Sequence, residues 1–275
     1  MTSPFLLTLL LLLLIPSTSH ADPGLASRYP DDVGLADDPA VLRVFDYEGD
    51  DWKEGWGCSK WDYYDVTDGP GVAFNGKRCL VKQVPAGTTG ASLTYDLAEP
   101  VDVLYHRVYA RFTADTPSAR IIGLSGVGEG LPQWKAMGSA GQPPDGTDYF
   151  CATLCTDYDD PLSSIWYPYH MDQKGKWGDN WPIEGRFPAD RWFHLEIMVK
   201  MNTPNEPDGE LRMWVEGKEV FTRTDLRWRA TEKVAVGRVI DQVYASKPFR
   251  KAGTFWMDNR VIAREYVGPM VEDGP

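Results

Sequence analysis

Short runs in which apolar and polar residues alternate recur along the chain, and this pattern limits the fold more than any other feature. The clearest run is 192–201, where apolar side chains at odd positions alternate with polar ones at even positions. A period of two is that of a β-strand with one buried face, and no long segment has the 3.6-residue period of an amphipathic helix. The expected strands are 41–48, 79–84, 91–96, 104–112, 121–126, 149–154, 164–171, 192–201, 210–216, 233–240 and 254–265.

Turn signals separate these runs, among them Asn75-Gly76 and Pro207-Asp208-Gly209. Many short strands joined by turns, without helices between them, are typical of a sandwich or barrel. No internal repeat or low-complexity linker divides the chain. We therefore expect an all-β fold in a single domain, and we favour a β-sandwich.

The chain opens with the pattern of a secretory leader. Residues 5–15 are almost all apolar and are followed by Pro16 and by the small-x-small motif Ser19-His20-Ala21. The run is shorter than the roughly 20 residues that span a bilayer, although residues 1–4 contain no Lys or Arg and a membrane anchor remains the alternative. We expect a signal peptide at 1–21, an extended lead-in at 22–40, and a secreted or periplasmic protein that leaves the membrane after cleavage.

Charge and cysteine content narrow the class of protein. A net charge of −12 argues against a nucleic-acid partner. The four cysteines would enter an oxidising compartment, where two disulfides can form in three alternative pairings. We expect the nearest-neighbour pairs Cys58–Cys79 and Cys151–Cys155. A zinc site is disfavoured because no CxxC pair or flanking His is present.

Three of the expected strands carry cations and aromatic rings on the face away from the core. An ordinary solvated sheet face has more Lys, Glu, Thr and Ser, so this excess indicates a binding surface. The 11 Trp and 13 Tyr of the chain support it, because flat rings stack on the apolar faces of sugars, although most Trp can equally fill the core. The expected binding residues are Arg107, Tyr109, Arg111, Glu196, Lys200, Arg212 and Trp214, with His194 as a catalytic helper.

Tyr167 and Tyr169 fall on the same face of one expected strand, about 7 Å apart. A phenol becomes a useful acid or base when nearby cations lower its pKa from about 10. Arg120 and His194 are among the cations that could do so. Two tyrosines that merely pack together are the alternative.

The order of several motifs resembles the secreted jelly-roll proteins of polysaccharide lyase family 14, the alginate-lyase-like group. The resemblance implies a concanavalin-like jelly roll over 41–270. It also implies that Tyr167 and Tyr169 are catalytic or substrate-binding. The motifs are residues 29–34, 44–49, 109–112, 122–126, the Tyr-x-Tyr strand at 166–169, 192–202 with 209–217, and 257–269.

One departure from the family pattern concerns its catalytic lysine. Arg120 stands where the family has that lysine, before Ile121-Ile122-Gly123-Leu124. Arginine can neutralise a carboxylate through two parallel hydrogen bonds, but it stays protonated and charged and so cannot readily transfer a proton. The resemblance also implies a structural Ca²⁺ between Glu48 and Asp258, since carboxylate oxygens suit this ion, while turn capping is the ordinary role for such residues. No redox or organic cofactor is implied.

These observations lead to one main hypothesis and two alternatives. The main one is β-elimination on an acidic, uronate-containing polysaccharide by a monomeric protein, with Arg120 and Arg111 holding the carboxylate. A non-catalytic carbohydrate-binding sandwich needs the same surface but no proton carrier. A glycoside hydrolase would need a second acid about 5–10 Å from Glu196, and no partner is evident in the sequence.

Overall fold

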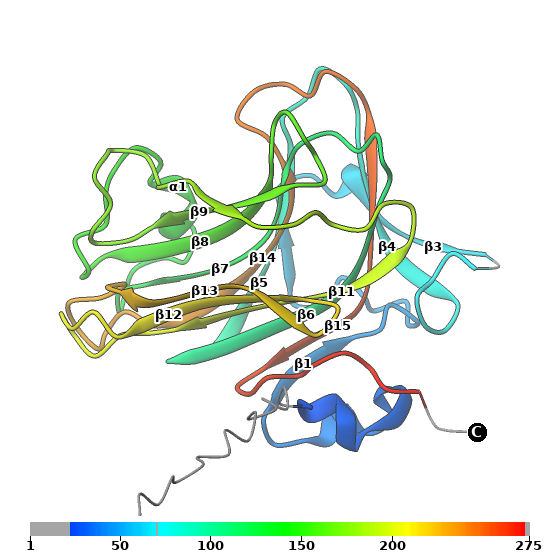
Figure 1. The fold of residues 1–275 in the computed structure, drawn as a ribbon, viewed down its shortest axis with the longest axis horizontal. Helices are drawn as coiled ribbons and strands as arrows, with labels where there is room; N and C mark the ends of the chain where they lie inside the picture. Colours follow the sequence, from blue (N-terminus) through cyan, green and yellow to red (C-terminus); the bar gives the residue numbers. More distant parts are fainter. Residues whose placement is uncertain (1–22, 70, 273–275) are drawn as a thin grey trace, which may run out of the picture.

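Two antiparallel β-sheets pack face to face in the computed structural model, which describes residues 23–69 and 71–272 (Figure 1). Sheet A has the order β13-β12-β11-β6-β15-β4-β3, with β1 paired to β15, and sheet B has the order β10-β9-β8-β7-β14-β5-β2. The sheet A strands are β1 (Val41–Phe45), β3 (Tyr64–Asp68), β4 (Arg78–Val84), β6 (Val103–Phe112), β11 (Trp192–Lys200), β12 (Gly209–Val215), β13 (Lys218–Leu226) and β15 (Gly253–Ala263). The sheet B strands are β2 (Trp56–Cys58), β5 (Gly90–Val101), β7 (Arg120–Val127), β8 (Tyr149–Thr156), β9 (Ser164–Tyr169), β10 (Trp181–Ile183) and β14 (Val236–Tyr244).

The jelly-roll sandwich expected from the sequence is confirmed, and every expected strand overlaps an observed one. Four strands were not predicted: β2, β3, β10 and β13. All four lie at the edges of their sheets. An edge strand buries little of either face, as the mostly exposed β13 illustrates, so its sequence has little reason to alternate.

The core lies between the sheets and is built by the predicted alternation. On β11, Phe193, Leu195, Ile197 and Val199 are all at most 1% exposed and face sheet B. A buried ionic cluster interrupts this apolar layer, in which Asp241 of β14 accepts hydrogen bonds from Lys82 of β4 and Arg260 of β15. Because a buried charge is costly unless paired, this cluster links the two sheets at a defined register.

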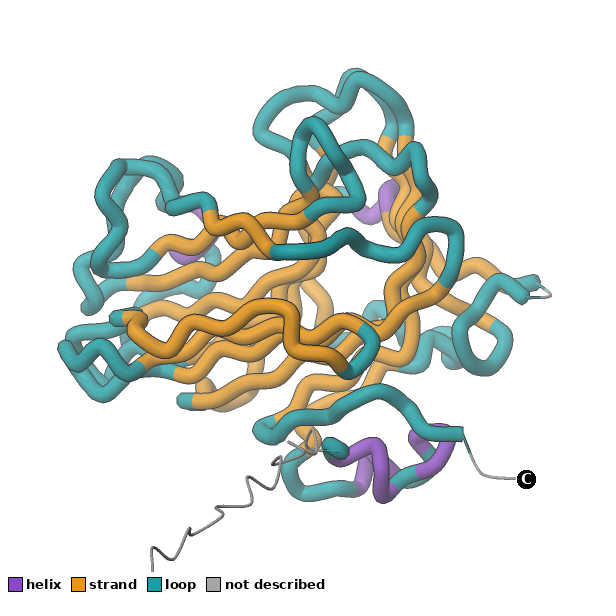
Figure 2. Tube along the Cα trace, viewed as in Figure 1, coloured by secondary structure: helices purple, strands orange, loops and turns teal. Residues whose placement is uncertain are grey.

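The lead-in, residues 23–40, differs from the extended segment expected. It forms three short 3-10 turns, Leu25–Arg28, Pro30–Asp32 and Leu35–Asp37, on the outer face of sheet A (Figure 2). Leu25 and Ala26 donate backbone hydrogen bonds to the carbonyls of Tyr266 and Val267 in the C-terminal tail, residues 264–272. The lead-in and the tail therefore lie side by side against sheet A (Figure 1). The expected signal peptide, 1–21, lies outside the described residues.

The expected disulfide pairs are wrong, since all four cysteines are free. Cys151 and Cys155 lie four residues apart on the single strand β8, a separation of roughly 13 Å that no disulfide can bridge. Cys58 belongs to sheet B, whereas Cys79 belongs to sheet A and points away from the core. In the described part of the chain, no helix has both the length and the apolar character needed to cross a membrane.

Candidate functional site

A cleft of about 600 Å³ lies on the outer face of sheet B, the face turned away from sheet A. Alternation along the strands sets which side chains reach it. Tyr149 and Thr153 of β8 face the cleft, while Phe150 and Leu154 point into the core. The short helix α1 (Lys135–Gly138) and Trp177 form its wall. The polar and aromatic side chains that line it include Ser92, Arg120, Tyr149, Thr153, Tyr167, Tyr169, Gln242 and Tyr244.

Tyr167 and Tyr169 share one wall of the cleft, as their spacing on β9 predicted. Their rings meet edge to face, with centroids 5.6 Å apart. The Tyr169 hydroxyl accepts a hydrogen bond from the backbone N–H of Gly141, 3.3 Å away. Burial and the contact with the Tyr169 hydroxyl raise the pKa of Tyr167 to about 12, although the charge of Arg120 opposes the shift. Tyr167 is therefore a protonated hydrogen-bond donor at neutral pH.

Arg120 lies between two of the cleft tyrosines. Its guanidinium carbon is 4.9 Å from the centre of the Tyr167 ring and 5.3 Å from that of Tyr244. Arg120 makes no ion pair with any described residue, and none of the described residues that line the cleft is Asp, Glu, Lys or His. The cleft thus holds a cation with no counter-ion, in a chain whose net charge is −12. An anionic ligand is the natural partner for such a site.

The structure brings Arg120, Tyr167 and Tyr169 together but not His194. This residue lies on β11 of sheet A, on the opposite side of the sandwich from the cleft. It is fully buried, and its Nε2 atom is 3.3 Å from Glu196. Sequence periodicity places a side chain on the core or non-core face of its strand, but it does not say which sheet the strand joins.

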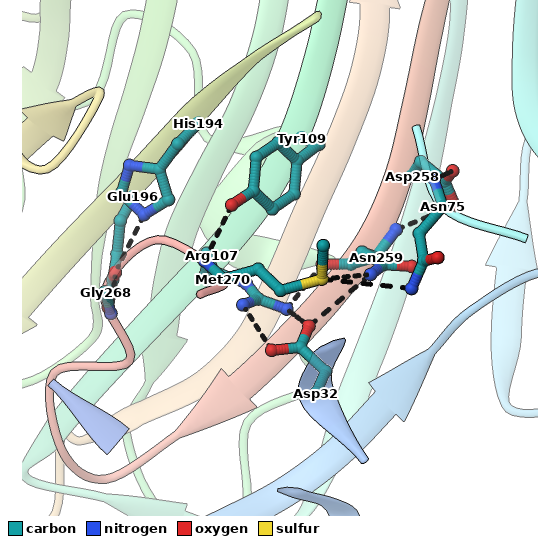
Figure 3. Close-up of polar contacts among 10 residues, drawn as sticks. All are labelled: Asp32, Asn75, Arg107, Tyr109, His194, Glu196, Asp258, Asn259, Gly268 and Met270. Atoms are coloured by element: carbon teal, nitrogen blue, oxygen red, sulfur yellow. Dashed lines mark hydrogen bonds and ion pairs between the residues drawn. The ribbon is translucent and has the colours of Figure 1, made fainter. Parts of the chain in front are cut away.

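Three of the expected binding residues instead make hydrogen bonds that attach the lead-in and the tail to sheet A (Figure 3). Arg107 pairs with Asp32 of the lead-in through both guanidinium NH₂ groups. The Tyr109 hydroxyl accepts the backbone N–H of Met270 at 2.7 Å. Glu196 accepts the N–H groups of Val267 and Gly268, each at 2.8 Å.

Glu196 therefore cannot act on a polysaccharide as the hydrolase alternative required. It is 0% exposed, and both of its carboxylate oxygens already accept backbone hydrogen bonds from the tail. The glycoside hydrolase alternative depended on a Glu196 carboxylate that faces a groove, and the structure shows no such carboxylate.

Lys200, Arg212 and Trp214 also lie on sheet A, away from the cleft. Lys200 and Arg212 both pair with Glu210, at 2.9 and 2.6 Å, and Arg212 also reaches Glu219. Trp214 packs against Tyr266 of the tail, with ring centroids 4.9 Å apart. Arg111, the remaining expected residue, lies on β6 of the same sheet.

Glu48 and Asp258, the expected calcium ligands, meet at one loop. Glu48 accepts the N–H groups of Lys77 and Arg78, and Asp258 accepts those of Phe74 and Asn75. Burial, with a smaller contribution from the charge of Glu48, raises the pKa of Asp258 to about 7. No described residue donates to Glu48 Oε2, so this oxygen keeps its lone pairs for a cation, whereas both oxygens of Asp258 already accept backbone N–H groups. No larger cluster of three His, Cys, Asp or Glu side chains occurs among the described residues.

The cleft residues that were not predicted from the sequence include Tyr149, Tyr244, Gln242 and Trp177. A signal existed for Tyr149, because the alternation in 149–154 puts it on the same face as Cys151 and Thr153. Tyr149 packs near Tyr169, and its hydroxyl contacts the carbonyl oxygens of Ser139 and Gln142. It thereby anchors the loop that presents Gly141 to Tyr169.

Comparison with known proteins agrees with this architecture. The family model described as Polysaccharide lyase 14 matches residues 183–245. No curated protein sequence gives a significant match. Among solved structures, the PL-14 alginate lyase from Aplysia kurodai is similar at 16% identity over 82% of this chain and 99% of that chain, with a TM-score of 0.66.

Two further solved structures are similar. Alginate lyase vAL-1 from Chlorella virus has 17% identity over 82% of this chain and 99% of that chain, with a TM-score of 0.62. The endo-β-1,4-glucuronan lyase from the fungus Trichoderma reesei has 15% identity over 81% and 95%, with a TM-score of 0.56. At these identities the structural likeness establishes the fold. Together with the match over residues 183–245, it confirms the resemblance seen in the sequence: the chain has the jelly-roll fold and is similar to the proteins of polysaccharide lyase family 14.

Proposed function

We propose that the cleft binds an acidic, uronate-containing polysaccharide and cleaves it by β-elimination. The observation that carries the proposal is Arg120, an unpaired cation held between tyrosine rings beside Tyr167 and Tyr169. A uronate brings one carboxylate per sugar, and the absence of acidic side chains from the described cleft lining leaves nothing to repel it. Similar structures named as alginate and glucuronan lyases support this substrate class.

Each cleft residue has a role that its position suits. The Arg120 guanidinium would neutralise the uronate carboxylate, which makes the proton on the adjacent carbon easier to remove. Tyr169, which accepts the Gly141 N–H, would take that proton as a phenolate. Tyr167 would give its proton to the departing glycosidic oxygen. The C–H electron pair then forms the double bond of the unsaturated sugar while the C–O bond breaks.

A non-catalytic binding protein is the second candidate, and one observation favours it. The family lysine is replaced by Arg120, and no Lys, His, Asp or Glu is present among the described lining residues to act as a base. If neither tyrosine becomes a phenolate in the complex, the same cleft would hold the polymer without cutting it.

Incubation with alginate and with glucuronan distinguishes these functions. Lyase action gives an unsaturated product that absorbs in the ultraviolet, and the absorbance should not develop with the Arg120→Gln variant. Tyr158→Phe, which changes an exposed tyrosine outside the cleft lining, is the matched control and should behave as the parent protein. Binding of these polymers without any absorbance change would establish the second candidate, whereas neither binding nor cleavage of any uronan would refute both.

We further propose that the mature protein is secreted or periplasmic, in keeping with the leader-like residues 1–21, and works as a monomer with one jelly-roll domain at 41–270. N-terminal sequencing of the mature protein tests the first point, with Asp22 as the expected first residue. Any mature chain that retains the leader would contradict it.

A structural Ca²⁺ held by Glu48 and Asp258 is a separate proposal, supported by their convergence on residues 74–78. A Ca²⁺ ion coordinated by both carboxylates would tie the loop at 74–78 to β15. Thermal unfolding with CaCl₂ should occur at a higher midpoint than with a chelator, and Glu48→Gln should lose the difference. Equal midpoints for the parent protein would contradict a bound ion.

A further inference from the structure

The lead-in and the tail cover only part of the outer face of sheet A. Beyond them, Trp192 of β11, Arg111 of β6 and Trp256 of β15 stand directly opposite one another in the antiparallel register. Their strand neighbours Phe193, Ala110 and Met257 belong to the core, so these three side chains share the outer face. We call them the tryptophan row.

The geometry of the row resembles that of a sugar-binding surface. Two strand spacings separate the backbones of the two tryptophans by about 10 Å, close to the length of two linked pyranose rings. All three side chains are partly exposed. The Arg111 guanidinium carbon lies 5.3 Å from the centre of the Trp256 ring, and Phe74 adds a ring 6.3 Å from that of Trp192.

Arg111 differs from its neighbours on this face in having no polar partner. Arg107 is paired with Asp32, and Arg212 with Glu210, whereas the side chain of Arg111 makes no hydrogen bond or ion pair with any described residue. Its Nε–H and the Nε1–H of Trp192 are both unpaired and shielded from water. The two NH₂ groups of the Arg111 guanidinium are not among these shielded atoms and also have no partner among the described residues, so they can donate to a ligand that carries acceptor groups.

We propose that the tryptophan row is a second binding surface for an acidic polysaccharide, on the opposite side of the sandwich from the cleft. The indole rings stack on sugar faces, and Arg111 pairs with a uronate carboxylate between them. The inference rests on the proposed function for its substrate class. Its consequence is avidity: a long polymer that engages both surfaces is retained more strongly than one held by the cleft alone.

Retention of the full-length protein in native gels containing alginate or glucuronan tests this surface separately from the cleft. In a background of Arg120→Gln with Tyr169→Phe, which disables the cleft, retention should persist. Adding Arg111→Gln or Trp256→Ala to that background should abolish it. Without the cleft changes, either substitution should weaken binding of long polymer by about tenfold or more. A neutral glucan in the gel should not retain any of the proteins.

The control is Arg43→Gln, which alters another strand arginine that lies over an aromatic ring, Phe45, at 5.1 Å. It should leave retention unchanged, and Trp256→Phe should keep most of the retention because it preserves a stacking ring. Circular dichroism of each variant establishes that the fold is intact. If the cleft-disabled protein is not retained, or if folded Arg111→Gln and Trp256→Ala variants are retained like the parent, the second surface is refuted. If Arg111→Gln reduces retention of a parent protein that cleaves no uronan, the row is supported while the proposed lyase activity fails.

Discussion

The two outer faces of the sandwich carry similar residues but use them differently. Both display arginines and tyrosines on strands of similar pattern. On sheet A, the guanidinium of Arg107 is paired with Asp32 of the lead-in, and the hydroxyl of Tyr109 accepts a hydrogen bond from Met270 of the tail. Both side chains are buried. On sheet B, Arg120 has aromatic neighbours but no counter-ion. What distinguishes a binding site from a structural contact here is therefore whether the polar groups already have partners in the protein.

The sharpest test of this difference is Tyr169→Phe, which removes one hydroxyl from the cleft. Because positioned acid–base groups contribute about 10²–10⁴-fold to rate, kcat on a cleaved uronan should fall by that factor while the fold persists. Initial rates of ultraviolet absorbance measure the effect. A variant as active as the parent would remove Tyr169 from the mechanism and leave Tyr167 as the candidate base.

Arg107→Ala should have the opposite signature, a large loss of stability. Arg107 is 0% exposed and Asp32 is nearly buried, so removing one partner of the pair should lower the free energy of unfolding by about 3–5 kcal/mol. Urea unfolding monitored by tryptophan fluorescence measures it. Arg120→Gln breaks no ion pair within the described protein and should change stability by less than about 1 kcal/mol, the range of surface substitutions. Equal losses in the two variants would contradict the distinction between the faces.

The pH dependence of cleavage should reflect Tyr167, the proposed acid. Tyr167, whose pKa burial raises to about 12, stays protonated and able to donate through the whole working range. Raising the pH from neutral should therefore cause no loss of activity through deprotonation of Tyr167 until about pH 12. A pH–rate profile that falls over this interval would indicate a different pair of groups.

The smallest effect is expected for Lys200→Ala. The Lys200 side chain is 46% exposed in its pair with Glu210, and such surface pairs contribute about 0.2–1 kcal/mol. Since Lys200 lies on the other sheet from the cleft, cleavage rates should stay at the parent value. A marked loss of activity with normal stability would show that sheet A takes part in the chemistry.

The sequence was sufficient for the sandwich and for the tyrosine pair, because both depend on local periodicity. Alternation along β9 put Tyr167 and Tyr169 on one face, and the resemblance to lyases drew attention to Arg120. The rest depended on long-range pairing. Nothing local distinguishes Glu196, which is buried by the tail, from a carboxylate facing a groove, and no spacing rule assigns β6 and β11 to the opposite sheet from β9.

The edge strands and the cysteines are further features that the local sequence pattern did not predict. β13 has little alternation because it buries little, so its existence follows from pairing with β12 rather than from its own residues. Cys151 and Cys155 are close in sequence, yet an extended strand keeps them apart. Proximity along the chain predicted the wrong pairing because it ignored the local conformation.

A crystal structure of the Tyr169→Phe variant with a short uronate oligosaccharide would test the cleft most directly. We expect a sugar carboxylate hydrogen-bonded to the Arg120 guanidinium, with its ring beside Tyr167 on the outer face of sheet B. An oligosaccharide that bound to sheet A alone, leaving Arg120 without an anionic partner at saturating ligand, would contradict the assignment of this cleft as the site of uronate recognition.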